Sequence, residues 1–110
     1  MKKSTKFAGT WHITEMENWD EDYFNMERQA YFEIDQRGWG EFQFGLVTGS
    51  IDGEVEQDGS GERFAFTWNG SDENDEASGS GWLKLKSKDR LEGRIKFHQG
   101  DSSLFLAERA

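Results

Sequence analysis

Residues 90–97 read RLEGRIKF, in which a charged residue alternates with an apolar residue or glycine. This period of two is typical of a strand buried on one face, because successive side chains point to opposite sides of a sheet. The same alternation recurs over residues 50–56, 63–68 and 82–86. The pattern therefore predicts an all-β chain of half-buried antiparallel strands.

The alternation along the rest of the chain predicts eight strands in all. They cover residues 7–15, 30–35, 41–46, 48–57, 63–68, 82–86, 90–97 and 103–109. Short connections with glycine or aspartate lie at 36–38, 58–61, 88–89 and 99–101. Strands joined by hairpins favour an up-and-down antiparallel barrel, because closure removes exposed sheet edges. A two-sheet sandwich is the alternative, but it usually needs longer crossover connections.

The composition fits one small domain that spans residues 1–110. The chain has no cysteine, which excludes disulfides, thiolate metal sites and thiol catalysis. Its 22 acidic and 13 basic side chains give a net charge of −9, so we expect no sequence-independent binding of nucleic acid. A low apolar fraction with this charge is typical of disorder, but the 16 aromatic residues can bury a large area.

The sequence predicts neither a membrane span nor a secretory signal. No apolar run is long enough to cross a bilayer. The start of the chain, residues 1–3, is basic, but no apolar segment follows it. We therefore expect a cytoplasmic protein with no membrane partner.

Two longer connections interrupt the strands. In residues 17–27, the side chains of Trp19, Tyr23 and Met26 share one face of a short helix, with Asn18 or Asp20 as its N-cap. We interpret this segment as a plug across one end of the barrel.

The second connection, residues 69–78, is predicted to be a polar, acidic loop. Its stretch at 72–76 offers oxygen ligands but lacks the spacing of a known calcium loop, so cation binding stays open. No other metal site and no cofactor is predicted.

Residues 7–11 read FAGTW, and the Gly9-Thr10-Trp11 motif on the first predicted strand resembles the calycins, which include lipocalins, fatty-acid-binding proteins and avidins. In that group the tryptophan closes the barrel floor and a basic residue on the last strand packs across it. The resemblance implies these roles for Trp11 and Arg109. The residues that follow do not match those with which avidins hold biotin, so biotin binding is not implied. The whole chain is also similar to a small bacterial protein family, which implies no activity.

If Trp11 points inward, the alternation also assigns Leu46 and Leu85 to the interior, and it leaves Leu104 and Leu106 competing with Phe105 for the inward face of the last strand. A group of inward aromatic rings faces inward glycines on other strands. These rings are Phe42, Phe44, Phe64, Phe66 and Trp68. An eight-stranded barrel either fills with side chains or holds one small ligand. Two interpretations stay open: a filled core, or a cavity in which these rings bind a small apolar ligand.

The outward positions of two neighbouring predicted strands form a basic stripe on an otherwise acidic barrel. The stripe consists of Trp82, Lys84, Lys86, Arg94 and Lys96, and Glu92 interrupts it. Charge is unevenly distributed, because residues 15–76 carry 18 acidic and three basic side chains, whereas residues 77–110 carry four and seven. One interpretation is ordinary surface charge that keeps the protein soluble. The functional interpretation is docking to an acidic protein surface, which includes the acidic side of another copy of the chain.

Two functions follow, and catalysis ranks below both. The first is non-catalytic binding of a small apolar ligand inside the barrel. The alternative is a filled barrel that acts as a protein-interaction module or self-associates through the basic stripe. The sequence has no nucleophile elbow and no phosphate loop, and its two histidines, His12 and His98, lie on strands that we expect to be separated by another strand.

Overall fold

The computed structural model describes residues 6–59 and 61–110. Within them, eight strands and one short helix follow one another. They are β1 (Gly9–Met16), α1 (Glu21–Phe24), β2 (Tyr31–Ile34), β3 (Trp39–Phe44), β4 (Val47–Asp58), β5 (Gly61–Asp72), β6 (Asp75–Ser87), β7 (Arg90–Phe97) and β8 (Ser102–Arg109). The basic residues 1–3 and Ser60, which belongs to the predicted turn at 58–61, lie outside the described residues.

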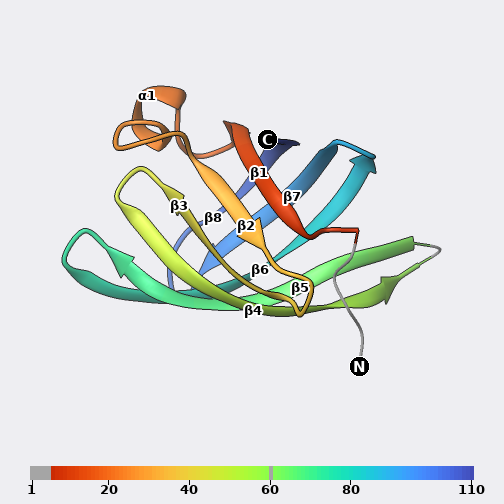
Figure 1. Cartoon of the computed structure of the whole chain (residues 1–110). Helices are drawn as coiled ribbons and strands as arrows, with labels where there is room; N and C mark the ends of the chain where they lie inside the picture. Colours follow the sequence, from red (N-terminus) through yellow and green to blue (C-terminus); the bar gives the residue numbers. More distant parts are fainter. Residues whose placement is uncertain (1–5, 60) are drawn as a thin grey trace.

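Each strand pairs antiparallel with the next strand in sequence, and β8 pairs with β1, so the barrel is closed. This up-and-down order confirms the predicted fold class and excludes the sandwich. It is also, at a coarse level, the fold that the calycin resemblance implies. Figure 1 shows the long strands β4, β5 and β6 bowed along one side of the barrel, with α1 at one end.

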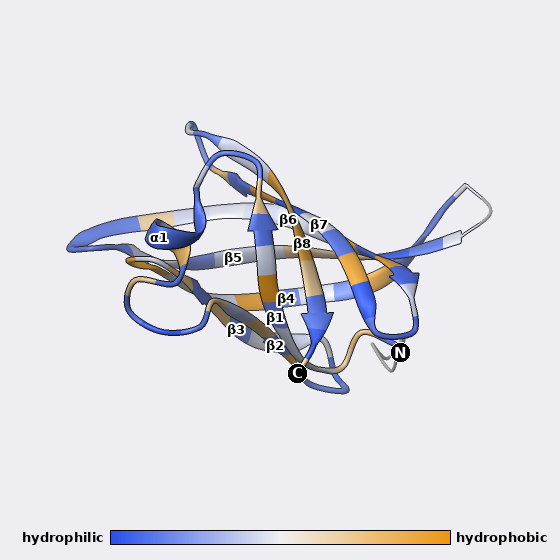
Figure 2. Ribbon diagram, turned by 90° about the horizontal axis from the view of Figure 1, so that it is seen from above, coloured by the Kyte–Doolittle hydropathy of each residue, from blue (hydrophilic) through white to orange (hydrophobic). Residues whose placement is uncertain are grey.

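The core is built from the inward side chains of all eight strands. Figure 2 shows hydrophobic and hydrophilic stretches along the same strands, and the buried positions of β8 alternate with more exposed ones. On β8, Phe105 and Ala107 are buried while Leu106 is 37% exposed. The competition for the inward face of this strand is therefore resolved in favour of the phenylalanine.

The predicted turns at 36–38, 88–89 and 99–101 are confirmed. Gly38 has φ of +93°, and a β-carbon there would lie 2.2 Å from the carbonyl oxygen of Gly53, so only glycine fits. No helix among the described residues has the length and apolar character needed to span a membrane.

The prediction of a loop at residues 69–78 is wrong. The strands β5 and β6 continue through it to a two-residue turn at Glu73 and Asn74, with Asn69 opposite Ser78 and Ser71 opposite Glu76. The ladder continues because it is held by backbone groups, which the polarity of the side chains does not weaken. Polar side chains indicate exposure here, and not the end of a strand.

The inward position of Leu46 was also predicted wrongly. Strand β3 ends at Phe44, and Gly45, with φ of +58°, begins a two-residue turn that contains Leu46. Val47 takes the buried position instead and is 1% exposed. The predicted inward Leu85 is only half-buried, because a β-bulge between it and Ser87 shifts the register of β6.

Candidate functional site

The five rings predicted to bind a ligand lie in the barrel interior, and each contacts at least one other ring of the five. Phe42 is 5.1 Å from Trp68 and 6.0 Å from Phe44 between ring centres, and Phe64 is 6.0 Å from Phe66. All five rings are at most 4% exposed. Such spacings are those of directly packed aromatic side chains.

Further rings join these five into one continuous cluster. Phe32 lies 5.0 Å from Phe42, 5.9 Å from Phe66 and 4.9 Å from Phe105 between ring centres. The centre of the barrel is thus occupied by side chains that contact rings from several strands. These contacts favour the filled core over a preformed cavity.

The inward glycines lie directly against these rings. A β-carbon on Gly49 would lie 2.6 Å from Phe42, one on Gly81 would lie 2.6 Å from Phe66, and one on Gly93 would lie 2.4 Å from Phe105. The glycines therefore make room for the bulky rings directly opposite them on the neighbouring strands and do not border empty space. An apolar ligand among the rings would have to displace them.

Trp19 closes one end of the barrel, ahead of α1. Its ring centre is 5.0 Å from that of Phe44 and 6.0 Å from that of Phe97. Tyr23 packs over Gly45, where a β-carbon would lie 2.3 Å from the tyrosine ring. Burial raises the pKa of the Tyr23 phenol above its usual range.

The third predicted member of the plug, Met26, is 51% exposed and does not pack in it. The helix is one turn long and ends at Phe24, so the spacing of a longer helix does not apply. Phe24, 2% exposed, takes the buried position that was assigned to Met26. Asp20 is the N-cap and accepts a hydrogen bond of 3.1 Å from the backbone N–H of Tyr23.

Trp11 and Arg109 meet at the β1–β8 seam. They are opposite each other in the ladder, and the guanidinium carbon of Arg109 lies 4.1 Å from the centre of the Trp11 ring. The Trp11 indole is fully buried, and its N–H donates to the carbonyl of Phe7 at 2.9 Å. The structure thus brings together the two residues that the calycin resemblance pairs.

The predicted basic stripe lies along the outer face of β6 and β7. Trp82 is opposite Arg94 in the ladder, and Lys96 lies two residues further along β7. Trp82 is half-buried, with the Lys84 ammonium 5.5 Å from its ring centre. Lys86 is exposed but sits in the β-bulge of β6, which displaces it from the regular row.

The cations of the stripe differ in their partners. Lys84 forms an ion pair with Asp58, and this ammonium lowers the pKa of the Asp58 carboxyl. Arg94 donates a hydrogen bond of 2.8 Å to the hydroxyl of Ser102, which is neutral. Lys96 is exposed and has no ion pair within the described part of the chain. Arg94 and Lys96 thus form no ion pair with a carboxylate of the described residues, and the acidic residue of their own strand is Glu92, two residues before Arg94 on the same face.

Two β-bulges flank a hollow on the outer face of β7 and β8. Thr14 is the extra residue of the bulge in β1, and Lys86 is the extra residue of the bulge in β6. Both residues line the same hollow of about 630 Å³. Leu106 and Arg90 also line it. This hollow was not predicted from the sequence, although residues 104–107 (LFLA) are apolar on both faces, so one pair had to face outward.

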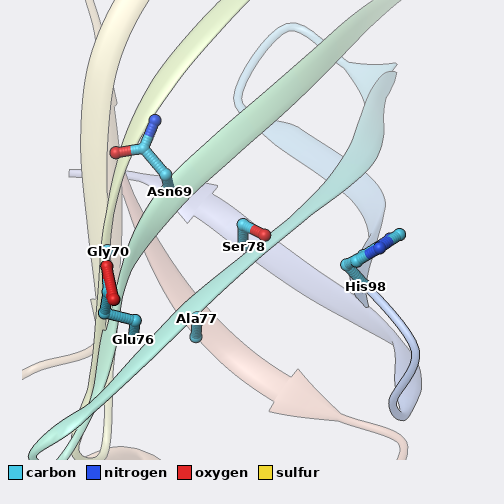
Figure 3. Close-up of a pocket in the computed structure, with 6 residues that line it drawn as sticks. All are labelled: Asn69, Gly70, Glu76, Ala77, Ser78 and His98. Carbon is cyan, nitrogen blue, oxygen red and sulfur yellow. The ribbon is translucent and has the colours of Figure 1, made fainter.

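A second depression, of about 480 Å³, lies on the outer face of β5 and β6 near their polar ends. Figure 3 shows Asn69 and Ser78 on neighbouring strands, with His98 at the edge. His12 lies on β1 and His98 follows β7, so β8 separates the two histidines as expected. No group of three or more histidine, aspartate or glutamate side chains that could hold a metal ion occurs within residues 6–59 and 61–110.

No protein-family model matches the chain, and neither a curated protein nor a solved structure matches it.

Proposed function

We propose that this protein is a non-catalytic interaction module whose filled barrel is a scaffold for its outer face. The observation that carries the proposal is the grouping of Arg94 and Lys96 with Trp82 on neighbouring strands of a chain with a net charge of −9. Arginine and tryptophan are enriched in protein interfaces, and cations that have no ion pair select a partner that presents carboxylates.

The hollow at Leu106 extends this surface. It adds an exposed apolar side chain beside the cations Lys86 and Arg90. An interface usually combines an apolar centre with a polar rim, and this pairing supplies both. The ligand that fits is a protein surface in which carboxylates flank an apolar side chain.

Binding of a small apolar ligand in the interior stays a prediction. Aromatic clusters inside a barrel are compatible with it. The contacts between rings and the glycines pressed against them favour the outer face as the working surface. A calycin-like origin of the barrel is supported by the packing of Arg109 on Trp11.

The proposal is tested with a fluorescein-labelled peptide of alternating glutamate and leucine, in fluorescence anisotropy at low and high ionic strength. We expect salt-sensitive binding. The double variant R94E/K96E should lose it. The matched control is R37E, because Arg37 also stacks on an exposed tryptophan, Trp39, at 4.8 Å but has no second cation beside it in the described ladder. Equal binding by R94E/K96E and the wild type would refute the proposal.

A further inference from the structure

Strand β4 extends past its neighbour on one side. It pairs with β5 along its whole length, from Val47 to Asp58, but β3 covers only the part from Val47 to Asp52. Within residues 6–59 and 61–110, no strand lies beside residues 54–58 on the β3 side. Figure 1 shows this end of β4 and β5 projecting beyond the other strands. Residues 54–58 therefore form a free sheet edge, which we call the β4 edge.

Two residues of the β4 edge direct their backbone polar groups away from β5. The N–H of Gly53 donates to the carbonyl of Gly38 at 2.9 Å, on the β3 side. Backbone groups of alternate residues in a strand point to the same side, so the N–H and C=O groups of Val55 and Gln57 point to the open side. No hydrogen bond from the described part of the chain reaches these four groups. Such a row is a template for an added strand.

The turn before β3 leaves this space open. Asp35 accepts hydrogen bonds from the backbone N–H groups of Arg37 at 2.8 Å and Trp39 at 3.0 Å, so the chain turns back towards β2. Arg37 stacks on Trp39 at 4.8 Å and forms no ion pair with Glu54. The turn therefore meets β4 at Gly38 and does not continue along the β4 edge.

The outward side chains of the β4 edge are acidic. They are Glu54, Glu56 and Asp58, which alternate with the buried Val55 and with Gln57. Glu56 and Asp58 form ion pairs with cations of β5 and β6. Glu54 is exposed and has no ion pair with a described residue. The β4 edge thus combines unpaired backbone groups with a row of carboxylates.

We propose that the β4 edge binds an extended basic peptide, which adds to the sheet as an antiparallel strand in line with β3. The peptide accepts hydrogen bonds from the N–H groups of Val55 and Gln57 and donates to their carbonyls. Its outward side chains lie beside the carboxylates, where lysine or arginine forms favourable cross-strand pairs. Its inward side chains lie beside Val55, where apolar groups fit. The sequence that matches alternates basic and apolar residues.

Charge excludes a second copy of this chain as the occupant. Two β4 edges paired antiparallel about a twofold axis at Glu56 would place Glu56 opposite Glu56 of the second copy, and Glu54 opposite Asp58 of the second copy. Like charges directly opposite each other destabilise a pair of strands. The β4 edge also differs from the stripe of Trp82, Arg94 and Lys96, which selects carboxylates. The inference therefore goes beyond the proposed function and does not depend on it.

The probe is a capped seven-residue peptide of alternating lysine and valine, titrated into the ¹⁵N-labelled protein at low ionic strength and followed by NMR. Without peptide, the amides of Val55 and Gln57 should exchange rapidly with solvent, whereas those of Glu54 and Glu56, which point to β5, should be protected. The peptide should shift and protect the amides of Val55 and Gln57. The control peptide is N-methylated at its valines, which keeps the charge but removes the donors that face β4. It should bind at least about 10-fold more weakly.

Two variants test the same edge from the protein side. Q57P removes one N–H from the open side, where a sheet tolerates proline, and should weaken binding of the peptide. E54K should weaken it as well, whereas E33K, with the same change of charge on β2, should bind like the wild type. The variant R94E/K96E should still bind the basic peptide, which separates this test from that of the proposed function.

Equal binding of the two peptides by the wild type would overturn the inference, because charge alone would then account for the affinity. This comparison needs no variant to fold. Amides of Val55 and Gln57 that do not respond to millimolar peptide would also overturn it. Protection of these amides before peptide is added would mean that the β4 edge is already covered, and protection that grows with protein concentration would identify a second copy as the occupant. Either result would contradict the proposed partner.

Discussion

The guanidinium carbon of Arg109, on β8, lies 4.1 Å from the centre of the Trp11 ring, on the neighbouring strand β1. The same guanidinium donates to the carbonyls of Ala8 at 3.0 Å and Lys88 at 3.4 Å, and it forms an ion pair of 3.5 Å with Asp89. One planar cation thus ties the beginning of the chain, the β6–β7 turn and the last strand together.

Replacing Arg109 by lysine keeps the charge but removes the planar fork and its stacking. We expect R109K to lower the free energy of unfolding by about 1–2 kcal/mol, measured by urea denaturation. R90K is the control, because the 3.9 Å ion pair of Arg90 with Glu108 is highly exposed, and its loss should cost less than about 0.5 kcal/mol. Equal stability of R109K and R90K would contradict the prediction.

Adding a methyl group at Gly93 tests whether the core is full. The new β-carbon would lie 2.4 Å from Phe105 and 2.8 Å from Leu83, so G93A should lose about 1–3 kcal/mol of stability in urea denaturation. At Gly61 the nearest atom is 4.0 Å away, and G61A should change stability by less than about 0.5 kcal/mol. If G93A is as stable as G61A, empty space borders the ring and the filled core is wrong.

Trp19, at one end of the barrel, and Trp39, on the outer side of β3, allow a matched comparison of the plug. Trp19 contacts three rings, including Phe44 in the core, whereas Trp39 is 55% exposed. We expect W19A to destabilise the fold by about 2–3 kcal/mol and W39A by less than about 0.5 kcal/mol, both measured by thermal unfolding. A small effect of W19A would mean that the plug does not support the barrel.

Tyr31 gives the fold a dependence on alkaline pH. Burial, and then a hydrogen bond of 2.5 Å donated to the Glu41 carboxylate, raises the pKa of its phenol to about 12, from 10.0. The folded state holds the neutral phenol, so its contribution to stability is complete below pH 10 and is lost as the pH rises towards 12. Ultraviolet titration of tyrosinate should show Tyr31 ionising at lower pH in E41Q. An unchanged titration in E41Q would contradict this role of Glu41.

The strand pattern could be predicted because one face of each strand is buried. Residues 90–97 alternate in the sequence and form β7 with the same bounds, and the closed order of the barrel follows from short connections. What the alternation does not reveal is where a strand ends. Residues 69–78 are polar on both faces, yet backbone hydrogen bonds extend β5 and β6 through them.

Less of the candidate sites than of the fold could be predicted from the sequence. The stripe of Trp82, Arg94 and Lys96 follows directly from the outward positions of two strands. The hollow at Leu106 depends on the β-bulges of β1 and β6, which only the assembled barrel brings together. The position of Met26 was mispredicted because helical spacing was extended beyond a helix of one turn.

A full barrel interior is the reason for assigning the function to the outer face. Xenon binding in a pressurised crystal tests most directly whether the interior is full. Xenon enters dry apolar cavities, so the variant F66A, which creates one, serves as the positive control. We expect no xenon inside the wild-type barrel and a xenon site next to Gly81 in F66A, where the Phe66 ring now lies. A xenon site between Phe42, Phe66 and Trp68 of the wild type would contradict the account and restore the interior ligand site.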